Sequence, residues 1–303
     1  MKPPAALDSI SPQSPLVEAA CAWLRERVDA PADGRPLDVA IAGDAVALAD
    51  AQRAMAALVS LGTRALAVAH KAQLEAAPDA EARDRVRTAL DAWLTDFRDA
   101  SDAIVHNAQA LITASPWIAT MTRSSLVERA LLAAHGAGRR VRVLLAESRP
   151  MNEGRGLAEA LAQAGVPTWF AVDGALSLLL PQAGALWIGV DAVRETTLVT
   201  KAGAYGLLLV ARELNLPVYA LAQRAKFLPD RCTRLTLPRR GPEEVWPEAP
   251  VGVSVVNVPF EEVPLSLVRG VVCESGFLGP REIQDVAGLT PVAAELLAPA
   301  PPT

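Results

Sequence analysis

The sequence predicts an α/β protein in which an N-terminal helical domain precedes a Rossmann-like domain with a mostly parallel sheet. Residues 14–113 are rich in Ala, Leu and Arg and have helical periodicity with almost no β-branched runs. After Pro116, short β-rich runs alternate with helical segments, as in a parallel sheet with crossover helices. We therefore place a helical domain at 1–115, a Rossmann-like ligand-binding domain at 116–288, and a flexible tail rich in Pro and Ala at 289–303.

Four helices are predicted in the first domain. The pair Ser14-Pro15 suits a helix start, because serine can cap the first turn and proline is tolerated there. Residues 31–36 contain Gly and Pro and are predicted as a loop. The last helix follows Pro78, and its apolar residues recur on one face. The predicted helices are 14–29, 43–61, 63–76 and 79–112.

Six strands and four helices are predicted in the second domain. Gly136 and Gly165 mark the ends of two of the helices, since glycine is favoured just beyond a helix C-terminus. The predicted strands are 117–121, 141–146, 167–172, 186–190, 217–222 and 251–258, and the predicted helices are 125–135, 155–164, 174–179 and 205–214.

Composition excludes several classes of protein. The net charge is −5 and the pI about 5.4, so no direct binding of nucleic acid is expected. No apolar stretch is long enough for a membrane span, and we expect a cytoplasmic protein. The three cysteines are widely separated and the three histidines lie on predicted helices without matching ligands, so neither a metal site nor a cofactor is predicted.

Polar residues follow the predicted strands, at the sheet edge where α/β proteins bind ligands. Arginine, lysine and a helix N-terminus can all bind phosphate oxygens, so this edge is predicted to bind a phosphorylated small molecule. Its residues are Thr122, Arg123, Ser124 and Ser125 after the first strand, Glu147, Ser148, Arg149 and Pro150 after the second, Asp173 and Gly174 after the third, Asp191 after the fourth, and then Lys201.

Structural roles are alternatives for most of these residues. Ser125 with Glu128 matches a capping box. Arg149 could pair with a glutamate of its own loop, Asp173-Gly174 suits a turn, and Lys201 could lie on the surface. Asp191 is the strongest functional candidate, because it directly follows a strongly apolar run where a carboxylate without a partner or a task is costly to bury.

The order of short motifs resembles the family that contains the regulatory subunits of initiation factor 2B, methylthioribose-1-phosphate isomerase and ribose-1,5-bisphosphate isomerase. The resemblance covers about 116–281, and it implies two domains with a ligand cleft between them and dimers as building blocks. Gly62-Thr63-Arg64 resembles the phosphate loop of the isomerases, which makes Arg64 a phosphate-binding candidate. The motifs are Ile118-Ala119-Thr120, Ser124 to Val127, Glu147 to Pro150 with Gly154, Gly189 to Val193, Lys201 to Tyr205, Lys226-Phe227 and Phe260 to Pro264.

Within this resemblance the chain departs from the isomerases. Their catalytic cysteine corresponds to Thr122, whereas their catalytic aspartate corresponds to Asp191 and is kept. Their Asn-Lys pair is Thr200-Lys201 here, and their Gln-Gly is Glu153-Gly154. A threonine hydroxyl is too weakly acidic to replace a thiol without an activating base, so efficient isomerisation is not expected.

Three functions therefore follow as hypotheses. The first is a protein that binds a phosphorylated sugar or nucleotide in the interdomain cleft without efficient turnover. The second is an aldose–ketose isomerase, an intramolecular oxidoreductase, acting on a sugar 1-phosphate through Asp191. The third is an assembly subunit of a translation-factor complex, with translation factors as partners. Each is compatible with a homo-oligomer, a dimer or larger.

Overall fold

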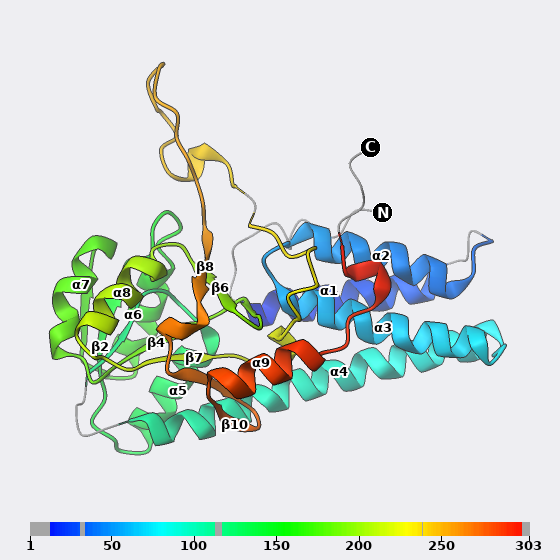
Figure 1. Cartoon of the computed structure of the whole chain (residues 1–303), viewed down its shortest axis with the longest axis horizontal. Helices are drawn as coiled ribbons and strands as arrows, with labels where there is room; N and C mark the ends of the chain where they lie inside the picture. The colour runs from blue at the N-terminus through cyan, green and yellow to red at the C-terminus, as the bar shows by residue number, and fades with distance from the viewer. Residues whose placement is uncertain (1–12, 31–33, 113–116, 238, 299–303) are drawn as a thin grey trace.

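The computed structural model describes residues 13–30, 34–112, 117–237 and 239–298. The expected domain boundary near 113–117 falls mainly on residues outside these ranges. The first region is formed by α1 (Gln13–Asp29), α2 (Leu37–Ala51), α3 (Ala56–Leu74) and α4 (Asp79–Ala108), all aligned along one end of the molecule (Figure 1). The α/β region follows at the other end, and α4 extends beneath it.

The break between the second and third helices differs from the sequence-based prediction. The chain turns at residues 52–55, where the Met55 N–H donates to the carbonyl of Gln52 at 3.0 Å. Gly62, which we expected at a helix boundary, lies inside α3. A Cβ atom at Gly62 would be 2.9 Å from the Cβ of Ala45 in α2. The glycine therefore permits a close crossing of two helices, which its sequence neighbourhood does not reveal.

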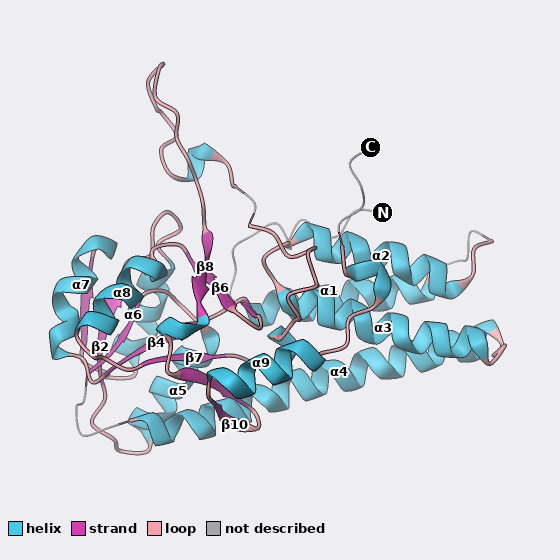
Figure 2. Ribbon diagram, viewed as in Figure 1, coloured by secondary structure: helices cyan, strands magenta, loops and turns pink. Residues whose placement is uncertain are grey.

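The α/β region is built on a seven-stranded sheet (Figure 2). The strand order is β10-β9-β7-β4-β1-β2-β3, and only β10 is antiparallel to its neighbour. The strands are β1 (Trp117–Thr120), β2 (Arg142–Ala146), β3 (Thr168–Ala171), β4 (Ala185–Gly189), β7 (Val218–Leu221), β9 (Gly270–Cys273) and β10 (Gly276–Leu278). This confirms the predicted α/β class with a mostly parallel sheet.

Helices cover both faces of this sheet. One face packs on α5 (Ser125–Gly136), α6 (Glu153–Gln163) and the C-terminal end of α4, and the other packs on α7 (Leu176–Leu179), α8 (Ala204–Glu213) and α9 (Pro280–Leu289). β4 illustrates the alternation, because Trp187 is buried in the first cluster while Leu186 and Ile188 are buried in the second. Apolar residues on both faces explain why the strand reads as one continuous apolar run.

A small second sheet combines two strands that lie between β4 and α8 in the chain with a third that follows β7. It contains β5 (Ala192–Val193), β6 (Thr197–Lys201) and β8 (Phe260–Pro264), in the order β5-β6-β8 with antiparallel pairing. The prediction of a strand at 251–258 is wrong. These residues belong to an extended excursion, 239–259, which projects away from the body before β8 (Figure 1) and which we call the arm. Four of its valines, Val251, Val253, Val256 and Val258, are exposed, so residues of high β-propensity there have no partner strand.

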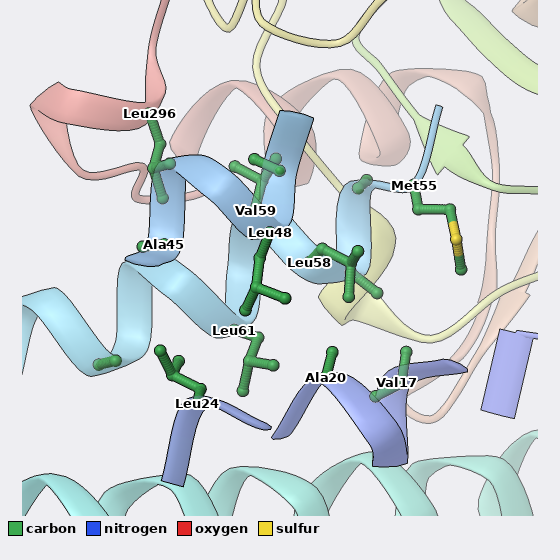
Figure 3. Close-up of a cluster of buried hydrophobic side chains, with 14 of the residues drawn as sticks. Val17, Ala20, Leu24, Ala45, Leu48, Met55, Leu58, Val59, Leu61 and Leu296 are labelled. Carbon is green, nitrogen blue, oxygen red and sulfur yellow. The ribbon is translucent and has the colours of Figure 1, made fainter. Parts of the chain in front are cut away.

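The end of the described chain returns to the helical region. After α9, a 3₁₀ turn at Ala294–Leu296 places Leu296, which is fully buried, against α2 and α3 (Figure 3). It lies beside Ala45 of α2 and close to Gly62 of α3, where an added Cβ would be 3.1 Å from the Leu296 Cδ1 atom (Figure 3). The expected flexible tail at 289–303 therefore contains a packed segment up to residue 298, because one large apolar side chain fills the helical core.

Candidate functional site

The candidate site lies where the strand order reverses, between β1 and β4. Crossover connections leave β1 in one direction and β4 in the other, and open α/β sheets bind ligands at such a switch point. Ser124, the residue before α5, packs there against β4. A Cβ atom on Gly189 would be only 2.5 Å from the Ser124 side chain, so glycine is required where the two segments meet.

Four polar side chains from separate segments form one buried network. The hydroxyl oxygens of Thr122 and Ser148 are 2.8 Å apart, the Ser148 hydroxyl is 3.0 Å from Glu153 Oε2, and the same carboxylate oxygen is 2.6 Å from Lys201 Nζ. A carboxylate only accepts and a hydroxyl has one proton. Ser148 therefore donates to Glu153, and Thr122 donates to Ser148. The sequence had suggested these residues separately, and the fold connects them.

The loop between β2 and α6, which contains Ser148, is constrained by hydrogen bonds and by close packing. The Asp173 carboxylate accepts the backbone N–H groups of Ser148 at 2.7 Å and Arg149 at 2.8 Å. Ser148 has a φ of 63°, an uncommon conformation for a residue with a side chain. α6 begins so close to the end of β2 that a Cβ on Gly154 would be 1.9 Å from the carbonyl oxygen of Ala146. Asp173 thus has the structural role that we considered, as an acceptor that shapes the loop between β2 and α6.

Lys201 is a buried cation at the end of β6, not a surface residue. Its side chain is only 6% exposed and its ammonium group is paired with Glu153. A second carboxylate, that of Glu244 in the arm, also interacts electrostatically with Lys201. The Arg240 guanidinium is the main cause of the lowered pKa of Glu244, and the charge of Lys201 contributes to the shift. Lys201 is therefore surrounded by negative charge from two segments.

Asp191 lies between the two sheets and beside a second buried lysine. Its carbonyl accepts the N–H of Ala56, the first residue of α3, at 3.1 Å, which links this loop to the helical region. The ammonium group of Lys226 donates to the Val190 carbonyl at 3.0 Å. Burial lowers the pKa of Lys226 from 10.5 to about 8, and the nearby Asp191 charge partly opposes that shift. Asp191, which directly follows an apolar run in the sequence, thus has the buried Lys226 as a neighbour.

Arg149 lies at the rim of the network. Its side chain is exposed and donates to two carbonyl oxygens, that of Pro150 at 3.4 Å and that of Val245 in the arm at 3.0 Å. Among the described residues no carboxylate forms an ion pair with Arg149. The expected alternative, pairing with a glutamate of its own loop, is therefore not observed, and Glu147 instead lies 3.8 Å from Arg155.

At the start of α5, Arg123 is held in an ion pair, whereas Ser124 and Ser125 mark the helix N-terminus. Arg123 forms a two-pronged ion pair with Glu128 at 2.8 and 3.2 Å, which raises the pKa of the arginine. The capping box predicted for Ser125 and Glu128 is not present, because Ser124 is the residue before the helix and Glu128 is held by Arg123. Ser125 is the half-buried first residue of α5.

Arg64 does not lie in a phosphate loop. Gly62, Thr63 and Arg64 are in the middle of α3, and Arg64 is exposed about 12 Å along the helix axis from the residue that contacts Asp191. The turn before α3 instead contains Arg53, half-exposed and 3.8 Å from Asp50. We missed Arg53 because the helix break was placed too late in the sequence. Glu153 and Lys226 were noted only within the family resemblance, since no local pattern indicates their long-range contacts.

The arrangement combines hydroxyls, carboxylates and ammonium groups, which can bind and orient a polar ligand through donors and acceptors alike. Among the described residues no group of three or more His, Cys, Asp or Glu side chains could hold a metal ion. In the same part of the chain, no helix has the length and apolarity needed to cross a bilayer. Of the predicted site residues, Thr122 and Lys201 are connected through Ser148 and Glu153. Arg123 is paired with Glu128 instead, and Arg64 lies along α3.

Fold and site together define a class of protein: a helical region joined to a doubly wound α/β domain, with a polar site at the switch point of its sheet. More specifically, the model of the "Initiation factor 2 subunit family" matches residues 18–280. The chain belongs to this family, which confirms the resemblance inferred from the motifs.

The curated relatives that match this chain include two different sugar-phosphate isomerases. A methylthioribose-1-phosphate isomerase of Maridesulfovibrio salexigens is 34% identical over 154 residues, 47% of this chain and 44% of the relative. A ribose 1,5-bisphosphate isomerase of Archaeoglobus fulgidus is 28% identical over 168 residues, 54% of each chain. The alignments thus span about half the length of these two curated relatives.

Solved structures share the fold over nearly the whole chain. The Pyrococcus horikoshii translation initiation factor eIF-2B has a TM-score of 0.79 at 24% identity, covering 92% of this chain and 96% of that one. A chain of the tetrameric eIF2B-beta2-delta2 complex of Chaetomium thermophilum has a TM-score of 0.71 at 21% identity, covering 93% and 91%. At these identities the similarity establishes the N-terminal helical region followed by the α/β domain.

Proposed function

We propose that the chain binds a phosphorylated sugar or nucleotide at the switch point, between the α/β domain and the helical region, without efficient turnover. The observation that supports this most directly is the buried network of Thr122, Ser148, Glu153 and Lys201. Burying two charges and two hydroxyls costs free energy that a purely structural core would avoid. Such a set of donors and acceptors instead matches the hydroxyl-rich surface of a sugar.

Efficient isomerisation is disfavoured by the bases available to Thr122. Removing a proton from a hydroxyl requires a strong base close by. The only acceptor that Thr122 has among the described residues is the Ser148 hydroxyl, which leads to Glu153. The Lys201 ammonium also donates to the same carboxylate oxygen of Glu153, at 2.6 Å, and so competes with Ser148 for it. A proton relay from Thr122 through Ser148 is therefore unfavourable.

Calorimetric titration with ribose 5-phosphate, ribose 1,5-bisphosphate and nucleoside monophosphates tests the binding proposal. We expect at least one to bind, and Asp191→Ala and Arg149→Ala to weaken that binding by about ten-fold or more, since each removes a charged group at the site. Arg155→Ala is a matched control, because Arg155 is an exposed arginine on α6 that only approaches Glu147. The proposal fails if the wild type binds none of the ligands, or if the two site variants bind as tightly as the control.

An isomerase is the second candidate, because the charge of Asp191 acts on the buried amine of Lys226. A lysine with a pKa of about 8 can exchange protons near neutral pH, as acid–base catalysis requires. Turnover of ribose 1,5-bisphosphate or methylthioribose 1-phosphate by the wild type, abolished by Asp191→Asn with binding retained, would establish it. Absence of turnover while these ligands bind would exclude it.

An assembly role has support from the arm. Its exposed apolar residues are Trp246, Val251, Val253, Val256 and Val258, and large exposed apolar surfaces are typical of interfaces. We propose that the chain forms a homodimer or larger oligomer. Sedimentation of the wild type should give a mass at least twice that of the chain, and Val256→Asp should lower it. Capture of translation initiation factors by the immobilised protein would favour a translation-complex subunit, and a monomer that captures none would refute the assembly role.

A further inference from the structure

We propose that Glu153 is a specificity residue that neutralises Lys201 from within the protein. The Lys201 end of the site then accepts the neutral hydroxyl or carbonyl oxygens of a ligand and rejects a phosphate group. This inference rests on the proposed binding function. It specifies which part of the phosphorylated ligand faces the buried lysine.

The ion pair between Lys201 and Glu153 disfavours a second anion at Lys201. Glu153 Oε2 is 2.6 Å from Lys201 Nζ, and Lys201 is only 6% exposed. A phosphate oxygen in contact with the same ammonium group would lie within about 5 Å of the Glu153 carboxylate, where two negative charges repel strongly away from bulk water. Glu244, whose charge also interacts with Lys201, adds to this repulsion.

Neutral oxygen groups fit the same position. An ammonium group has three N–H donors. One donates to Glu153, so Lys201 can still donate to a hydroxyl or carbonyl oxygen of a ligand. Glu153 has a second carboxylate oxygen that can accept a ligand O–H. Thr122 and Ser148 extend the row of hydroxyls. The site therefore offers both donors and acceptors to a polyhydroxylated carbon chain.

A cation for the phosphate is available at the rim. Arg149 is exposed and donates only to backbone carbonyl oxygens among the described residues, so its guanidinium charge is not neutralised by an ion pair. A bound sugar phosphate would place its phosphate toward Arg149 and its hydroxyls toward Lys201. Glu153 fixes this orientation, because exchange of the two ends would bring the phosphate beside two carboxylates.

The chain provides a matched control for the charge of Glu153. Glu147 lies on the loop that leads into α6, whose first residue is Glu153, and its side chain is also 18% exposed. It approaches Arg155 at 3.8 Å rather than Lys201. Glu147→Gln and Glu153→Gln remove the same charge from neighbouring positions, but only the second frees the buried ammonium group.

Calorimetric titration of the full chain and both variants with inorganic phosphate, ribose and ribose 5-phosphate tests the inference. We expect Glu153→Gln to bind inorganic phosphate at least about ten-fold more tightly than the wild type, because the freed ammonium gains a charge-assisted bond. Glu147→Gln should stay within about two-fold of the wild type. Adding Lys201→Met to Glu153→Gln should remove the gain.

Equal phosphate affinity of the wild type and Glu153→Gln would overturn the inference, provided that thermal unfolding shows both to be folded. If Glu153→Gln does not fold, Glu153→Ala frees the same lysine and must give the same gain. A wild type that binds ribose 5-phosphate without a gain in the variants refutes the specificity role alone. No binding of any ligand by any of the proteins refutes both this role and the proposed function.

Discussion

Replacing Gly154 with alanine perturbs the junction that positions the binding loop. The added Cβ would lie 1.9 Å from the Ala146 carbonyl oxygen, whereas ordinary contacts begin near 3.4 Å, so the start of α6 must move by about 1.5 Å. Overpacking costs about 1–3 kcal/mol, and here the obstacle is backbone that cannot rotate away. Weakening the bond from the Gly154 N–H to the Glu147 carbonyl adds about 1 kcal/mol. We expect a loss of about 2–4 kcal/mol in unfolding free energy.

Urea unfolding followed by tryptophan fluorescence and circular dichroism measures this loss. Gly206→Ala is the matched control, because Gly206 is exposed in α8 and a Cβ there would meet nothing within 4 Å. Alanine is the better helix former, so this variant should be unchanged or more stable by up to about 1 kcal/mol. If Gly154→Ala lies within about 1 kcal/mol of the wild type, the close junction does not constrain α6 as we infer.

Three further predictions concern stability and reactivity. Leu296→Ala should lower the unfolding free energy by about 2–4 kcal/mol in the same assay, since it empties part of the helical core; an unchanged midpoint would mean that the segment is not packed there. Because the folded-state pKa of Lys226 is about 8 and its unfolded value is 10.5, the folded protein binds fewer protons between these pH values. Its contribution to stability should therefore rise by up to ~3 kcal/mol from pH 8 to 10.5, and Lys226→Met should lack this rise; parallel pH profiles would contradict it. Burial raises the pKa of Cys21 to about 11, and Cys232 and Cys273 are also buried, so thiol reagents should label the chain only after unfolding, as mass spectrometry can verify.

Much of the α/β architecture could be predicted because its signals are local. β1, β2, β3, β4 and β7 each form a short apolar run between helix and turn signals, and the structure confirms all five. The strands of the small sheet were missed for a physical reason. β5 has two residues, and β8 pairs with β6 across a long excursion, so no period in the sequence marks either. At 251–258 the error was the opposite, because a strand was predicted where none forms. The valines there have high strand propensity but no strand to pair with.

The candidate site was predictable as a location but not as a set of contacts. The rule that ligands bind at the carboxyl ends of parallel strands was enough to select Thr122 and Arg149. Lys201 ends β6, an antiparallel strand of the small sheet, so the rule does not cover it. It could not show that Lys201 would be paired with Glu153, because that contact depends on how an inserted sheet packs against the start of α6. Glu128 was expected to form a capping box with Ser125, and in the folded chain Arg123 binds it instead.

The burial of Leu296 makes the helical region discontinuous in sequence. Its core is assembled from α1 to α4 and from a segment at the far end of the chain, with the whole α/β domain between them. Cutting the chain near residue 115 would thus separate the helical core from one of its own pieces and would also end the contacts of α4 with α5. The two regions should consequently melt together, and a fragment that ends at α9 should expose the groove between α2 and α3 that Leu296 now fills.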